Sequence, residues 1–165
     1  MAFARFSMIS VKQGSEPMPT TTATFDDTAI NALDKVLIRS LDARAGFQTL
    51  VEKAEPEFRP VAEEFLALHT SHAERLSILL KRRGLEPETD GSFMAKINEG
   101  VVSIRALVDE IDEDVMDNIR SGETFIASAF KEAIDAVPVA SREHGDLIAM
   151  KVDLDTLLAR TSHLD

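Results

Sequence analysis

The 165-residue chain contains no cysteine, no tryptophan and no tyrosine. The lack of cysteine excludes disulfides, thiolate zinc sites and thiol nucleophiles. The lack of tyrosine excludes tyrosyl radicals and phenolic acids. No apolar run is long enough to span a bilayer, and residues 1–13 lack the apolar segment of a secretory signal. We therefore expect a cytoplasmic protein that does not associate with membranes.

Positive charge is also in short supply, with 18 Lys and Arg residues against 29 Asp and Glu residues and a net charge of -11. Such a chain repels phosphate backbones, which argues against nucleic acid as a partner. The 44% hydrophobic and 28% charged residues are typical of a globular protein, and 165 residues suffice for one domain. No strand pattern is present, so the composition and pattern predict an all-α fold.

Hydrophobic periodicity predicts four long helices. They cover residues 26–53, 61–83, 113–136 and 139–160. A shorter helix is expected over 92–107. Residues 1–25 include Pro17 and Pro19 and have no sustained period, so we expect an N-terminal arm followed by a helical domain over 26–165. Thr24, with Asp27 three residues later, indicates a capping box at the start of the first helix.

The lengths of the connections predict a topology. Short turns after residues 53 and 136 make two antiparallel hairpins. A helix of about 24 residues is roughly 36 Å long, and the segment 85–112 is long enough to return over that distance between the second and third helices. Two hairpins joined by one long crossover, which here carries the short extra helix, form the ferritin-like arrangement of the four-helix bundle.

Three stretches carry a resemblance to a known family: LIRSLDARAGF, GLEPETDGSFMAKINEG and IRSGETFIASAFKEAI. They resemble a family of bacterial ferritin-like four-helix-bundle proteins that is catalogued as a domain of unknown function. The similarity covers approximately residues 33–158. The resemblance implies the bundle fold and a relationship to the di-iron carboxylate proteins, and it implies no established activity.

A ferritin-like di-iron site takes a carboxylate from each of two helices and a Glu-x-x-His pair from each of the other two. The candidate metal ligands in this chain are His72, Glu123, His69 and Glu143. The pair His69-x-x-His72 has histidine in place of the glutamate, and Glu143 is followed by Asp146 where the pattern has histidine. Glu123 lies on the apolar stripe of its helix. The candidate set is therefore an incomplete di-iron pattern for iron or manganese.

Each candidate also has a structural interpretation. His72 fits a hydrogen-bonded core histidine, and His69 fits a surface position. A buried Glu123 must be protonated, paired or metal-bound. The negative charge of Glu143 would be favourable near the N-terminus of its helix, where the helix dipole is positive. The expected pairing partners of Glu123 are Arg44, Arg105 and His72.

Two functions of different class follow from these alternatives. In one, the bundle binds iron or manganese for storage or redox work. In the other, it is a metal-free structural or interaction module that self-associates as a homodimer, because Phe3, Phe6 and Phe25 would be costly in water unless they cover a core end or a partner. The incomplete ligand pattern favours the metal-free module. No catalytic residues and no cofactor-binding motif are identified, so we do not expect an enzyme.

Overall fold

The computed structural model describes residues 25–87 and 115–164, which form four helices and contain no strand. The helices are α1 (Asp27–Lys53), α2 (Arg59–Arg82), α4 (Met116–Ala136) and α5 (Arg142–Arg160). This confirms the all-α prediction. The helix predicted over 92–107 and nearly all of the N-terminal arm lie outside the described residues. None of the described helices is long and apolar enough to cross a membrane.

The helix starts differ from the predicted ones because of local capping. Asp26, rather than Thr24, caps α1, and its side chain accepts a hydrogen bond of 2.8 Å from the amide of Ala29. Ser141 accepts a hydrogen bond of 3.2 Å from the amide of His144, so α5 begins later than predicted. Such caps satisfy amide groups that have no partner within the helix. Helix α2 begins earlier than predicted, since Pro60 is tolerated in its first turn.

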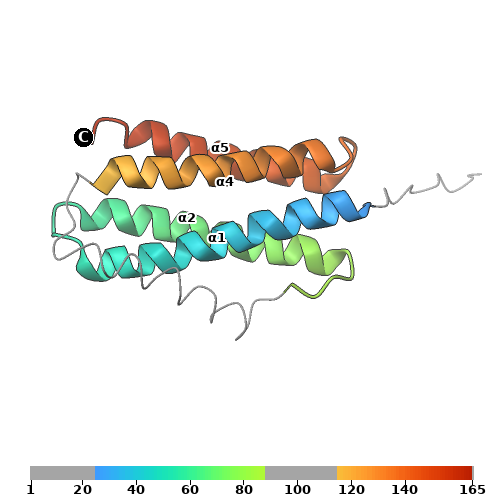
Figure 1. Cartoon of the computed structure of the whole chain (residues 1–165), viewed down its shortest axis with the longest axis horizontal. Coiled ribbons are helices and arrows are strands. Elements are labelled where there is room, and N and C mark those ends of the chain that lie inside the picture. Colours follow the sequence, from blue (N-terminus) through green and yellow to red (C-terminus); the bar gives the residue numbers. More distant parts are fainter. Residues whose placement is uncertain (1–24, 88–114, 165) are drawn as a thin grey trace, which may run out of the picture.

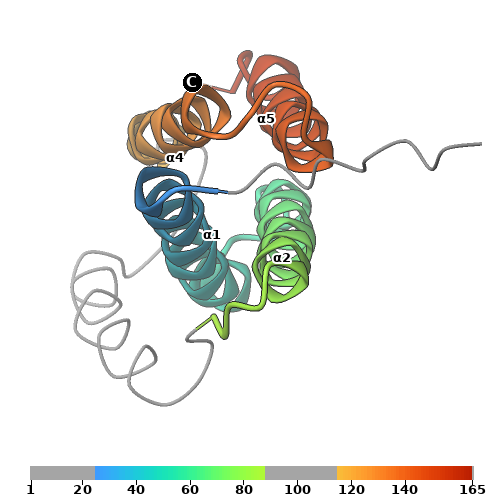
Figure 2. The ribbon, with the colours of Figure 1, turned by 90° about the vertical axis from the view of Figure 1, so that its right-hand side faces the viewer.

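The four helices occupy the corners of a bundle (Figure 2). Helix α1 packs against α2 and α4, and α5 packs against α4 and α2. Helices α2 and α4 run in the same direction, opposite to α1 and α5 (Figure 1). Each packed pair is therefore antiparallel, and the two predicted hairpins are confirmed. Helices α2 and α4 lie at opposite corners of the bundle and do not pack directly against each other. Contacts between them are made by side chains that reach across the interior.

Two clusters of buried apolar side chains fill the interior. One surrounds Leu33, Leu76, Phe130 and Met150. The other contains Phe47 and Phe65, whose rings stack with their centroids 4.9 Å apart, together with Met116 and Leu157. Large buried rings and leucines contribute most of the hydrophobic stabilisation of such a bundle, because each buries a large apolar area.

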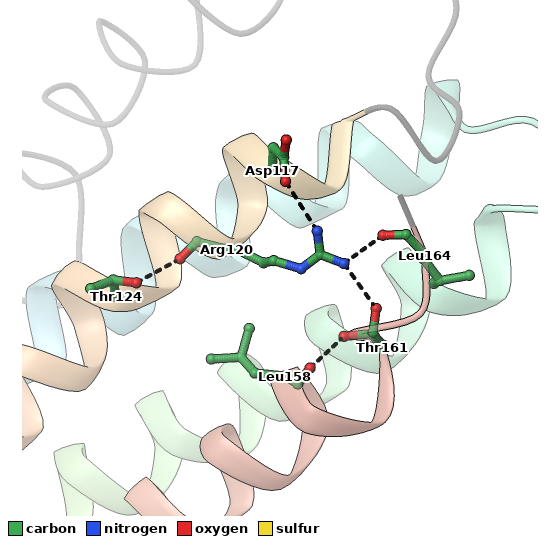
Figure 3. A network of polar contacts seen from close by, with 6 residues as sticks. All are labelled: Asp117, Arg120, Thr124, Leu158, Thr161 and Leu164. Atoms are coloured by element: carbon green, nitrogen blue, oxygen red, sulfur yellow. Dashed lines mark hydrogen bonds and ion pairs between the residues drawn. The ribbon is translucent and has the colours of Figure 1, made fainter.

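The C-terminal end of α5 is tied to α4 by Arg120 (Figure 3). The guanidinium group donates hydrogen bonds to the carbonyl of Thr161, at 3.2 Å, and to the carbonyl of Leu164. It also pairs with Asp117 at 3.1 Å. Carbonyl groups at a helix C-terminus have no partner within the helix, and a cation is favourable there. Arg120 therefore fixes the last turn of the chain on the bundle.

The beginning of the described chain is fixed in a similar way. Phe25, the last residue of the predicted arm, is buried against the first apolar cluster. The guanidinium carbon of Arg83 lies 4.1 Å from the centre of the Phe25 ring, a cation–π contact. Phe25 thus covers one end of the core, which is one of the two roles expected for the phenylalanines of the arm.

Candidate functional site in the bundle interior

The two apolar clusters meet at the histidines of α2. His69 and His72 lie one turn apart and are both buried. The ring of His69 stacks on Phe47 of one cluster with a centroid distance of 5.5 Å, and the ring of His72 contacts Phe130 of the other at 5.4 Å. The surface position considered for His69 is therefore wrong, because the buried stripe of α2 includes His69 together with Ala62 and Ala73.

Glu123 of α4 reaches His69 across the centre of the bundle. Its Oε1 atom lies 2.9 Å from Nε2 of His69, and both side chains are buried. The imidazole N–H donates this hydrogen bond when the carboxylate is ionised, because an ionised carboxylate can only accept. Of the predicted partners of Glu123, neither Arg44 nor His72 forms this hydrogen bond. Arg44 lines a groove on the α1–α2 side of the bundle, and Arg105 lies outside the described residues.

We call His69, His72 and Glu123 the polar layer. Four of its buried polar atoms have no hydrogen-bond partner in the part of the chain that the structure describes: Nδ1 of His69, both ring nitrogens of His72 and Oε2 of Glu123. Buried polar atoms in proteins nearly always have a partner, and an orphaned one commonly marks a bound water or ion. The polar layer therefore has unused capacity to bind a small ligand.

His72 is neutral at physiological pH. Burial, together with smaller effects of the neighbouring His69 and Arg75, lowers its pKa from 6.5 to about 4, against the opposing effect of Asp153. A neutral imidazole keeps a lone pair that can bind a metal ion. Sequence analysis missed Asp153, whose Oδ2 atom lies 3.9 Å from Nε2 of His72. Asp153 directly precedes Leu154, which is buried on α5, and this position in the sequence could have indicated that Asp153 lies near the core.

The fourth candidate, Glu143, lies elsewhere. It forms a paired hydrogen bond with Arg83, with distances of 2.9 and 2.6 Å. Although burial opposes ionisation, this guanidinium group lowers the pKa of Glu143. Arg83 follows His72 by eleven positions, so the pair is about 16 Å along the helix from the polar layer. The structure thus brings His69, His72 and Glu123 together and leaves Glu143 apart.

A two-metal carboxylate centre does not fit this interior. It needs several inward carboxylates, whereas the polar layer supplies Glu123, and the α5 stripe continues with Leu154 and Leu157. In the described ranges, no three His, Asp or Glu side chains are placed to hold a metal ion as they stand. The donor types nevertheless suit one ion, because two imidazoles and one carboxylate are a common set for a single transition metal.

Comparison with known proteins identifies the chain by family. A family model described as "Domain of unknown function (DUF2383)" matches residues 28–136. The match includes both histidines of the polar layer and Glu123, but it ends before Glu143 and Asp153. No curated protein and no solved structure matches significantly. Since the model covers more than half of the 165 residues, the chain belongs to the DUF2383 family, a domain of unknown function.

Proposed function

We propose that this chain is a ferritin-like four-helix bundle whose polar layer binds one divalent transition metal ion, iron or manganese. The main observation in support of this proposal is that four buried polar atoms of His69, His72 and Glu123 have no hydrogen-bond partner among the described residues. The ferritin-like assignment is supported by the parallel direction of the diagonal helices α2 and α4, which requires a long connection between two antiparallel hairpins.

His69 and Glu123 would hold the ion from two sides of the bundle. Their Nε2 and Oε1 atoms are 2.9 Å apart. Two donors bound to one ion at about 2.1 Å and at right angles would be separated by about 3 Å. His72 would supply the third donor, since its ring nitrogens have no partner, and its ring would have to turn for the three donors to converge. When bound, such an ion supplies Lewis-acid or one-electron redox chemistry.

The test is metal binding by the whole chain purified without a metal-affinity tag. Elemental analysis and titration with Mn²⁺, followed by the loss of the free-ion EPR signal, should give about one ion per chain. Glu123→Gln keeps the size of the side chain but removes the anionic donor, and His72→Leu removes an imidazole donor. Both variants should bind Mn²⁺ at least about tenfold more weakly.

The matched control is Glu143→Gln. It makes the same chemical change at another buried glutamate, in the ion pair with Arg83. This variant should bind Mn²⁺ like the unmodified chain. The proposal is contradicted if the unmodified chain takes up no Mn²⁺ and no Fe²⁺, or if Glu123→Gln binds as tightly as Glu143→Gln.

A second candidate function is a metal-free module that self-associates. Exposed apolar side chains favour it: Ile148 and Val152 lie one turn apart on α5, and Val152 is 55% exposed. Contiguous apolar surface of this kind marks interaction sites more often than isolated residues do. In this case the hydrogen bond between His69 and Glu123 would serve to specify how α2 and α4 align.

Light scattering after size-exclusion chromatography tests this second candidate. The unmodified chain should elute as a dimer. Ile148→Lys combined with Val152→Lys should raise the dissociation constant of this dimer at least about tenfold. Ile78→Lys is the matched control, since Ile78 of α2 is similarly exposed and lines the groove on the α1–α2 side of the bundle. A monomer at all concentrations would contradict self-association.

A further inference from the structure

Helix α1 is buried on two opposite sides in its second half. Phe47 faces the interior, where its ring stacks on Phe65. Thr49 follows Phe47 by two positions, and two positions turn a helix by about 200°, so its side chain leaves on the opposite side. Thr49 is nevertheless only 6% exposed. The side of α1 that points away from the interior is therefore covered at Thr49.

We call Ile38, Asp42 and Thr49 the outer face of α1, since spacings of four and seven positions place them on one side of the helix. Burial also raises the pKa of Asp42, against the opposing charge of Arg39. Among the described helices α1 contacts α2 and α4, which flank the outer face (Figure 2). The cover therefore comes from a part of the chain outside the four helices.

The corresponding side of α5 is open to solvent. It contains Gly145, Ala149, Val152 and Thr156, which recur at spacings of three and four positions and are all exposed. The connection over 88–114 joins the end of α2 to the start of α4, and both α1 and α5 lie between these two helices (Figure 2). The difference in burial indicates that the connection passes over α1.

The connection has a segment that suits the outer face. The helix predicted over 92–107 lies outside the described residues, and five of its apolar residues recur with the helical period: Phe93, Ile97, Val101, Ile104 and Leu107. Such a stripe is costly in water unless it is covered. A helix over this range is about 24 Å long, and its flanks supply the rest of the roughly 32 Å along α4.

We propose that the apolar stripe of residues 92–107 packs lengthwise on the outer face of α1, so that the connection between α2 and α4 crosses α1 and leaves α5 free. The segment runs parallel to α1, because the connection starts beside the beginning of α1 and ends beside its end. This inference does not depend on a bound metal ion. It leaves the outer side of α5, with the exposed Val152, as the face open to a second copy.

Paired cysteines test this arrangement in the full chain, because the sequence contains no cysteine of its own. Thr49→Cys is combined in turn with Val101→Cys, Ile104→Cys and Leu107→Cys. A disulfide needs Cα atoms within about 7 Å, so oxidation should form an intramolecular bond in at least one of these three variants. Mass spectrometry of the digested monomer identifies the bond.

The matched control places the first thiol on α5, with Val152→Cys combined with the same three cysteines. These variants should form no intramolecular bond. An intramolecular bond to position 152, or none to position 49, would overturn the route over α1. A bond between Thr49→Cys and Phe6→Cys would also overturn it, because the N-terminal arm would then be the cover.

A second measurement does not depend on the register of the segment. Thr49→Cys alone should react with a maleimide at least about tenfold more slowly than Ala149→Cys on the open side of α5. Ile104→Asp places a charge in the apolar stripe and should bring the rate at position 49 close to that of Ala149→Cys. Ile148→Asp is the matched control and should leave the rate unchanged. A slow rate that Ile104→Asp does not raise would contradict the proposal.

Discussion

Replacing His69 by alanine is expected to lower the free energy of unfolding of the metal-free protein by about 3–5 kcal/mol. The substitution removes the hydrogen-bond partner of Glu123 at 2.9 Å and leaves a buried carboxylate alone at the centre of the bundle. It also leaves a cavity beside Phe47, on which the His69 ring stacks. Urea denaturation at pH 7 in the presence of a chelator measures the effect.

Removal of both partners should behave differently. When His69→Leu is combined with Glu123→Met, no buried polar group is left without a partner, and volume is roughly retained. Replacing a buried ion pair by apolar residues is often neutral or stabilising by about 1–4 kcal/mol. The double variant should therefore be at least as stable as the unmodified protein, although it cannot bind the proposed metal ion.

A surface pair provides the comparison for this result. Lys151 and Asp155 form an ion pair of 2.7 Å on α5, and Lys151→Ala should cost at most about 1 kcal/mol. If His69→Ala costs no more than Lys151→Ala, then Glu123 is not confined to a dry interior. Water would then reach the polar layer, and the interpretation of its orphaned atoms as a ligand site would lose its basis.

The helices could be predicted from the sequence because their apolar residues recur with the helical period. Phe65, Leu76, Phe130 and Leu154 belong to these periodic apolar residues, and all four are buried. The helix starts were less accurate, since they depend on which side chain turns back onto the backbone. Ser141 is one such cap, and periodicity alone does not distinguish it from the neighbouring residues.

The candidate site could be predicted only in part. Glu123 and His72 stood out as polar residues on apolar stripes, and both are buried. The partner of Glu123 could not be inferred, because His69 meets it across the diagonal of the bundle and 54 positions away in sequence. The partner of Glu143 could not be inferred for the same reason, since Arg83 comes from the end of another helix. Such pairings are decided by tertiary packing, which one sequence does not encode locally.

Acidification is expected to destabilise the metal-free protein through His72 before it affects the carboxylates. Burial lowers the pKa of His72 to about 4 in the folded protein, from 6.5 in the unfolded chain. Between these two pKa values His72 is protonated in the unfolded state and neutral in the folded state. The free energy of unfolding therefore decreases as pH falls below 6.5. Between pH 7 and pH 5 the expected loss is about 2 kcal/mol, at about 1.4 kcal/mol per pH unit.

The window from pH 7 to pH 5 separates this effect from that of Glu143. The pKa of Glu143 is lowered by Arg83, so its contribution is present above its ordinary value of 4.5 and is lost only at lower pH. Urea denaturation in the presence of a chelator at pH 7, 6 and 5 measures the slope. His72→Leu should flatten it, whereas His144→Gln, which leaves the polar layer in place, should keep it. An equally steep slope in His72→Leu would mean that another group takes up the proton, and His72 would then be hydrated rather than buried among His69, Arg75 and Asp153.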